Sequence, residues 1–207
     1  MKVLGINAIK RKGDIEMKVI GINGSPRKGG NTEVMIRKVF KPLEEKGIET
    51  ELVQIGGRAV RGCIACGKCG EMKNNTCVMT KDPVNDIIRK IIEADGVILG
   101  SPTYFTDVTS ELKALIDRAG FVAMNNKGLF KHKVGAGVVA VRRGGATHVL
   151  DTINHLFQIS QMFIVGSTYW NMAYGLQPGE VAEDKEGMAN MTDIGESMAF
   201  LLNKLKG

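Results

Sequence analysis

The sequence predicts an α/β domain with a doubly wound, five-stranded parallel sheet. From residue 17 onward, five strand-like apolar runs alternate with segments in which apolar residues recur at helical spacing. Parallel neighbours in a sheet need a crossover between them, and right-handed crossovers place helices on the faces of the sheet. A chain of 207 residues has the length of one ordinary domain of this kind.

The strand-like runs are short, and the segments between them have one apolar face. The runs are residues 18–23, 51–55, 96–100, 134–141 and 163–165. Between the second and third runs, apolar residues fall at i, i+3, i+4, i+7 and i+8, namely Val84, Ile87, Ile88, Ile91 and Ile92. Similar spacing predicts helices around residues 34–43, 108–119, 150–157 and 194–205. Ligands of parallel sheets bind at the carboxyl ends of the strands, so functional residues are expected in the loops that follow the strands.

Composition excludes several classes of protein. The chain has 28 Lys and Arg against 22 Asp and Glu, a net charge of +6, but these cations are spread along the sequence and aromatic residues make up only 5%. This pattern argues against nucleic-acid binding, and small anionic ligands account for the positive charge. The longest apolar stretch, residues 134–141, is far shorter than the roughly 20 residues that cross a bilayer, and charges at residues 10–14 interrupt any secretory signal. We therefore expect no membrane association and a cytoplasmic location.

The first sixteen residues stand apart from this pattern. Residues 1–13 match residues 17–29 at nine of thirteen positions, but only the second copy continues into a helical segment. We interpret residues 1–16 as an N-terminal extension, a degenerate duplication, that precedes a domain of residues 17–207. An extra edge strand or a partner contact is the alternative.

The loop after the first strand has the composition of a phosphate site. Residues 24–32 (GSPRKGGNT) join a strand to a helix N-terminus and contain three glycines, two hydroxyls and two cations. Free N–H groups and the positive end of the helix dipole favour an anion there. The loop is neither a Walker A motif nor a G-x-G-x-x-G dinucleotide motif. A simple turn with Asn31 or Thr32 as the helix cap is the alternative.

Two further loops complement the first. Residues 101–106 (SPTYFT) combine a proline, two aromatic rings and hydroxyl groups, which suit a flat heteroaromatic ring. Residues 142–147 (RRGGAT) place glycines where the backbone can approach a ligand closely. Together the three loops predict a phosphate, a ring and a close backbone contact at one edge of the sheet.

These loops, with Leu112-Lys113 and Ile116-Asp117-Arg118, resemble the NAD(P)H-dependent FMN reductase family, which has a flavodoxin-like fold. The resemblance extends from about residue 17 to the C-terminus. It implies that the FMN phosphate is held by Ser25, Arg27, Asn31 and Thr32. It implies that the isoalloxazine ring is lined by Pro102, Thr103, Tyr104 and Phe105, and closed on its other side by Arg142, Arg143, Gly144 and Gly145. No acid–base triad is visible, and we assign no catalytic side chain.

All four cysteines lie in one cysteine-rich loop, residues 62–80. The spacing Cys63-x2-Cys66-x2-Cys69-x7-Cys77 favours a metal site over a disulfide framework. Structural zinc usually takes two separated cysteine pairs or histidines, whereas closely spaced thiolates of this kind are typical of iron–sulfur clusters. The loop resembles that of the iron–sulfur flavoproteins, which implies a 4Fe-4S cluster beside the FMN domain. Zinc and unfilled thiols are the alternatives.

The two expected cofactors predict an electron-transfer function. FMN carries one or two electrons and an iron–sulfur cluster only one, so a protein that holds both can connect two-electron with one-electron partners. Reduced ferredoxin and NAD(P)H are both suitable redox partners, and the family resemblance implies a homodimer or homotetramer. Two other functions stay open: an NAD(P)H-dependent FMN or quinone reductase without a cluster, and a metal-binding or redox-sensing module without a flavin.

Overall fold

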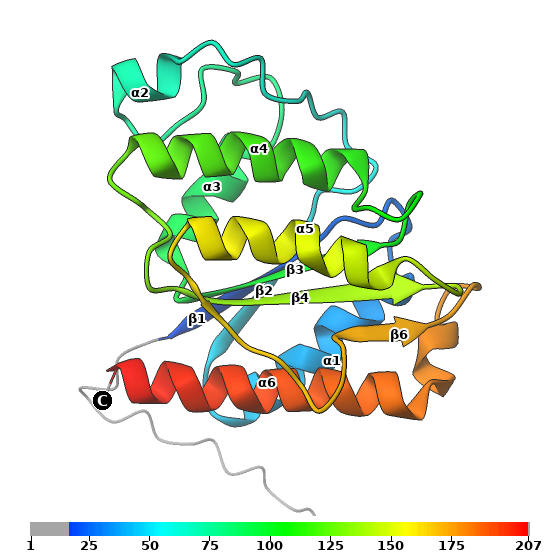
Figure 1. Cartoon of the computed structure of the whole chain (residues 1–207). Coiled ribbons are helices and arrows are strands. Elements are labelled where there is room, and N and C mark those ends of the chain that lie inside the picture. The colour runs from blue at the N-terminus through cyan, green and yellow to red at the C-terminus, as the bar shows by residue number, and fades with distance from the viewer. Residues whose placement is uncertain (1–16, 207) are drawn as a thin grey trace, which may run out of the picture.

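The computed structural model describes residues 17–206 and contains a parallel sheet between two layers of helices (Figure 1). The strand order is β2-β1-β3-β4-β5, and all of these neighbours are parallel. In that order the strands are Glu49–Gln54, Lys18–Asn23, Gly96–Pro102, Val134–Val141 and Phe163–Ile164. The predicted α/β class and the five parallel strands are confirmed. The predicted N-terminal extension, residues 1–16, lies outside the described residues.

The sheet also has a sixth strand, β6 (Met172–Tyr174), which the sequence does not predict. It pairs in parallel with the second half of β4, whereas β5 pairs with the first half. Val134 lies opposite Phe163, a separation of 29 residues, but Val139 lies opposite Met172, a separation of 33. Four extra residues therefore loop out between β5 and β6, and they divide one edge strand into two short ones.

Each face of the sheet is covered by its own layer of helices (Figure 1). One layer consists of α1 (Asn31–Glu45) and α6 (Lys185–Lys206), and the other of α3 (Val84–Glu93), α4 (Ser110–Asn125) and α5 (Ala146–Ile159). Two short helices lie outside these layers: α2 (Lys68–Met72) in the cysteine-rich loop, and the 3-10 helix η1 (Glu180–Glu183) before α6. Among residues 17–206, no helix has an apolar stretch long enough to cross a membrane.

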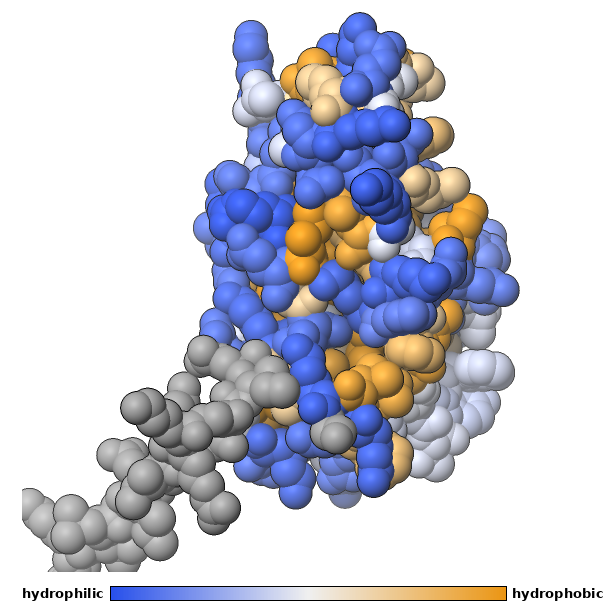
Figure 2. Space-filling model, turned by 90° about the vertical axis from the view of Figure 1, so that its left-hand side faces the viewer, coloured by the Kyte–Doolittle hydropathy of each residue, from blue (hydrophilic) through white to orange (hydrophobic). Residues whose placement is uncertain are grey.

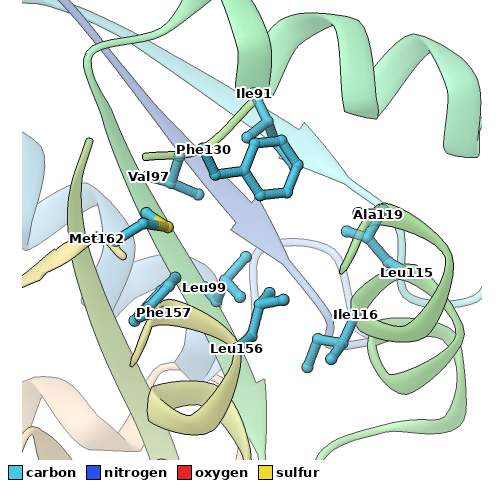
Figure 3. Close-up of a pocket in the computed structure, with 10 residues that line it drawn as sticks. All are labelled: Ile91, Val97, Leu99, Leu115, Ile116, Ala119, Phe130, Leu156, Phe157 and Met162. Carbon is cyan, nitrogen blue, oxygen red and sulfur yellow. The ribbon is translucent and has the colours of Figure 1, made fainter. Parts of the chain in front are cut away.

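The two helical layers pack on the sheet through separate apolar cores. In the layer of α1 and α6, Ile36, Val39 and Met198 are fully buried. In the other layer, side chains from β3, α3, α4 and α5 point toward one another around Phe130 and Phe157 (Figure 3). They enclose a gap of only about 10 Å³ with an apolar lining. Close packing of this kind makes the layers a rigid support for the loops at the sheet edges.

Because all the strands run in the same direction, their carboxyl ends share one edge of the sheet, on the right in Figure 1. Figure 2 views the molecule from the opposite, amino-terminal edge, with the cysteine-rich loop at the top and groups of hydrophobic residues bordered by hydrophilic ones in the middle of the face. The candidate flavin loops lie at the carboxyl edge, where ligands of such sheets are expected.

Candidate functional site

The loop after β1 is fixed to β3 by close backbone contacts. The Gly24 N–H donates to the Gly100 carbonyl at 2.8 Å, and the Thr109 hydroxyl donates to the Gly24 carbonyl at 2.8 Å. A Cβ on Gly24 would lie 2.9 Å from the Gly100 oxygen, so this approach requires glycine. The Asn23 Oδ1 accepts from the Ser25 N–H at 3.0 Å. The start of the loop is therefore held in one conformation.

The first turn of α1 leaves polar groups available for an anion. Gly30 is the N-cap and has no side chain to accept from the first N–H groups of the helix. Neither Asn31 nor Thr32 acts as the cap, and the Asn31 Oδ1 instead accepts from the Val181 N–H at 3.5 Å. The Thr32 hydroxyl is buried and has no hydrogen-bond partner within residues 17–206. A phosphate oxygen at this helix N-terminus would satisfy that hydroxyl, so the residues present fit a phosphate.

The middle of the same loop is ordered by its own side chains. Ser25 is buried, and its Oγ accepts from the Arg27 N–H at 3.2 Å. The Arg27 side chain is exposed and donates to the Leu176 carbonyl at 3.4 Å. The Glu33 carboxylate accepts from the Gly29 N–H at 2.8 Å, and this bond is the main reason why the pKa of Glu33 lies below its usual value.

The three predicted loops meet at the carboxyl edge of the sheet. The Thr103 N–H donates at 2.9 Å to a carbonyl at the end of β4. A Cβ on Gly145 would lie 2.9 Å from the Thr106 side chain, so the loop after β4 contacts the loop after β3. The Gly175 N–H donates to the Val141 carbonyl at 2.9 Å. The segment after β6 thus joins the same edge, although the sequence analysis gave it no role there.

The loop after β3 presents two aromatic side chains on a tight turn. The backbones of Tyr104 and Asp107 exchange hydrogen bonds of 2.9 and 3.0 Å, and the two residues between them, Phe105 and Thr106, have φ values of 47° and 67°. This left-handed conformation is costly for residues other than glycine and concentrates at functional sites. The Phe105 side chain is fully exposed, and Tyr104 is 46% exposed. The remaining predicted ring contacts are half-buried (Pro102, Thr103, Gly145) or exposed (Arg142, Arg143, Gly144).

The cysteine-rich loop lies between β2 and α3, on the outer side of α4 (Figure 1). Its cysteines, Cys63, Cys66, Cys69 and Cys77, all line one pocket of about 240 Å³. In the part of the chain that the structure describes, no three side chains of His, Cys, Asp or Glu are arranged to hold a metal ion. The fold therefore brings the four thiols to one pocket without converging them on a single point.

One face of α4 forms a wall of this cysteine pocket. The residues of that face follow helical spacing, i, i+3, i+4 and i+7: Arg118, Phe121, Val122 and Asn125. The Asn125 amide lies 3.9 Å from the Cys69 sulfur, and the Asn126 amide donates to the Cys69 carbonyl at 3.2 Å. Helix α4 thus supplies apolar cover to the pocket, and at its C-terminal end one amide lies near a thiol and the next holds the backbone of the cysteine-rich loop.

Arg118 is the charged residue of that wall, and it is 1% exposed. Its guanidinium pairs with Asp82 and donates to the carbonyls of Arg61 at 3.1 Å and Met79 at 2.9 Å. Burial lowers the pKa of Arg118, but the hydrogen bond with Asp82 and the nearby Cys77 side chain outweigh it, so the pKa lies above its usual value. Burial alone would raise the pKa of Asp82. The Arg118 guanidinium and nearby backbone N–H groups outweigh this effect, so the pKa of Asp82 lies below its usual value.

Several positioning residues were missed because they carry no recognisable pattern. Asn85 holds the Cys77 backbone from both sides, accepting from its N–H and donating to its carbonyl, each at 2.8 Å. The Gln54 amide donates to the Ser25 carbonyl at 2.6 Å, in the loop after β1. Single amides of this kind are common on surfaces and give no signal. Arg118 belongs to a tripeptide that marks the family resemblance, which was the one available hint.

Comparison with known proteins agrees with these features. The family model for NADPH-dependent FMN reductase matches residues 17–177. The chain is 36% identical over 184 residues to an iron-sulfur flavoprotein of Methanocaldococcus jannaschii, covering 86% of this chain and 93% of that protein. It is 34% identical over 208 residues to an iron-sulfur flavoprotein of Methanosarcina thermophila, covering 100% and 97%. A solved WrbA-like flavodoxin from Agrobacterium tumefaciens has the same fold, with a TM-score of 0.63 at 16% identity, covering 91% of this chain and 99% of that one.

Proposed function

Because the chain belongs to the NADPH-dependent FMN reductase family and is a flavin-dependent oxidoreductase, we propose that it passes electrons between FMN and a 4Fe-4S cluster. The observation that carries the proposal is that all four cysteines line a single pocket against α4. The names of the two relatives, both iron-sulfur flavoproteins, support the same assignment.

For the flavin, we propose the carboxyl edge of the sheet as the binding site. The unpartnered Thr32 hydroxyl and the uncapped N-terminus of α1 support a phosphate there, with Ser25, Arg27 and Asn31 as the other phosphate residues. The ring would lie between two groups of residues: Pro102, Thr103, Tyr104 and Phe105 on one side, and Arg142, Arg143, Gly144 and Gly145 on the other. Bound FMN supplies the two-electron chemistry, and these residues bind and orient it. The loop offers one terminal-phosphate cradle, so chromatography of the released cofactor should give FMN; FAD would contradict the site.

For the cluster, the donor chemistry fits. Four thiolates are the ligand set of a 4Fe-4S cluster, which supplies one-electron transfer when it is bound. The chain's own residues hold the loop in place, through Asn85 at Cys77 and Asn126 at Cys69. The pocket rim is apolar, because Ile64, Val78 and Phe121 are each between 43% and 51% exposed.

We further propose NAD(P)H or reduced ferredoxin as the redox partner, a homodimer or homotetramer, and a cytoplasmic location. The exposed apolar rim of the cysteine pocket supports association, since large apolar side chains grouped on a surface often mark contacts between chains. A reducing compartment keeps closely spaced thiols available as ligands.

The deciding experiment is the stoichiometry of iron, acid-labile sulfide and flavin after purification without oxygen. The proposal predicts about four irons and four sulfides for each FMN and each chain. Flavin without iron would support the second candidate, an NAD(P)H-dependent FMN or quinone reductase, which the family description favours. Zinc without sulfide, or metal without flavin, would contradict electron transfer between the two cofactors.

A further inference from the structure

Arg118 closes the cysteine-rich loop at both ends. Its guanidinium donates to the carbonyl of Arg61, two residues before Cys63, and to the carbonyl of Met79, two residues after Cys77. These are hydrogen bonds from a charged donor inside the protein, which are stronger than neutral ones. One side chain of α4 therefore holds together the two ends of the segment that carries all four cysteines.

The same side chain has donor capacity left over. A guanidinium has five N–H donors, and the Arg118 Nε–H is buried with no hydrogen-bond partner within residues 17–206. A buried donor without a partner costs free energy, so its persistence needs an explanation. Arg118 lines the same pocket as all four cysteines, so this side chain borders the space that the proposed cluster would occupy. A ligand with sulfur atoms in that pocket would bring hydrogen-bond acceptors to the side of the protein where this donor lies.

The charge of Arg118 also exceeds what the loop needs for closure. A neutral donor would bridge two carbonyls without the cost of burying a cation. Asp82 pairs with the guanidinium and offsets this cost, and its own side chain is 7% exposed. The protein therefore keeps a full ion pair beside the thiols, with the cation as the member that lines the pocket.

Resting on the proposed cluster, we propose that Arg118 is a positioning residue that also sets the reduction potential of the group bound by the cysteines. It does so by placing a buried positive charge, and its remaining N–H donor, on the Cys77 side of the pocket. Reduction adds negative charge to a cluster, and a nearby cation and hydrogen bonds to the sulfurs stabilise the reduced form. Removing the charge of Arg118 therefore lowers the potential.

The test compares variants that separate charge from loop closure. Asp82→Asn keeps an oxygen that can accept from the Val84 N–H, as Asp82 does at 3.2 Å, but removes the negative charge beside Arg118. Asp82→Asn/Arg118→Met then removes the cation without leaving Asp82 buried and unpaired. Arg118→Lys keeps the charge and loses the Nε–H. Iron and sulfide per chain are measured first, and FMN content reports whether the rest of the domain is folded.

Reduction potentials are then measured by redox titration followed by EPR. At a fixed potential, we expect Asp82→Asn to raise the ratio of reduced to oxidised cluster relative to the parent protein. The double variant should lower this ratio at least tenfold relative to Asp82→Asn, which corresponds to about 59 mV for one electron. Arg118→Lys should give a smaller fall relative to the parent protein. Loosening of the loop alone would not make the potential rise on removal of the Asp82 charge and then fall on removal of the Arg118 charge. Equal potentials in all cluster-containing variants would overturn the inference.

Two outcomes keep this test separate from that of the proposed function. A parent protein without iron and sulfide would overturn the cluster itself. If the double variant loses its cluster, the two single variants decide. A raised potential in Asp82→Asn supports the part of the inference that concerns charge, and a lowered potential in Arg118→Lys supports the part that concerns the Nε–H donor. An unchanged potential in either variant overturns the corresponding part. Loop closure has its own readout in metal-free protein, where the double variant should be cleaved faster by trypsin at Lys68 and Lys73 than Asp82→Asn. Equal cleavage rates would overturn the part of the inference that concerns positioning.

Discussion

Replacing Thr32 by Val should change the flavin-free and the flavin-bound protein in opposite directions. Thr32 is 1% exposed, and its hydroxyl has no partner within residues 17–206. A buried hydroxyl without a partner costs about 1 to 3 kcal/mol, so the variant's free energy of unfolding without flavin should rise by up to this amount. A hydrogen bond to a charged phosphate contributes about 1.5 to 3 kcal/mol. Its loss should weaken FMN binding roughly 10- to 150-fold.

Ser160 provides a matched control for this experiment. Its hydroxyl is also buried without a partner within the described residues, but it lies at the C-terminal end of α5, away from the flavin loops. Ser160→Ala should therefore also stabilise the flavin-free protein, while the dissociation constant for FMN stays unchanged. Urea unfolding followed by circular dichroism gives the stabilities, and quenching of flavin fluorescence gives the affinity. A Thr32→Val variant that binds FMN as tightly as the parent would refute the phosphate assignment.

Three further changes test other parts of the molecule. Glu33→Gln weakens the bond to the Gly29 N–H, and the free energy of unfolding at pH 7 should fall by about 1.5 kcal/mol. Because the folded-state pKa of Glu33 lies below 4.5, this difference should be complete above that pH and disappear as the pH falls through the folded-state value; urea unfolding over a pH series checks it. Cys77→Ala should yield a labile or three-iron cluster by EPR at unchanged FMN content, and a parent without an EPR signal or iron would contradict the cluster. Phe121→Asp, at the 51% exposed rim of the cysteine pocket, should shift the oligomer toward the monomer in light scattering, whereas a monomeric parent would contradict association through this rim.

The order of helices and strands could be predicted because apolar spacing reports which face of each element is buried. Prediction from apolar spacing failed where backbone geometry, and not the pattern of side chains, determines the structure. β6 is three residues long and follows a looped-out segment, so no apolar run marks it. Helix α6 begins at Lys185, before the predicted apolar positions, and its first turns pack through Gly187, where a Cβ would lie 2.5 Å from the Ala173 side chain. A glycine that packs closely has no hydrophobic signature.

The candidate sites divide in the same way. The four cysteines and the loop after β1 could be singled out as candidates because their residues are close together in the sequence. The partners of Arg118 are not: Asp82 is 36 residues away from it, Met79 is 39 and Arg61 is 57. The groups that bind this buried cation come together only in the folded protein, so neither the burial of Arg118 nor its role can be predicted from local residue spacing.

Helix α4 connects the two candidate sites. The Thr109 hydroxyl, directly before the helix, donates to the Gly24 carbonyl in the loop after β1 at 2.8 Å, and the Thr109 N–H donates to the Ser101 hydroxyl at 3.1 Å. Nine residues later the same helix presents Arg118 to the cysteines, and at a rise of about 1.5 Å per residue these positions lie about 14 Å apart along the axis. Helical hydrogen bonds fix this separation, whereas a loop would let it vary. Helix α4 therefore holds the turn at Gly24 and the wall of the cysteine pocket at a fixed separation within one chain.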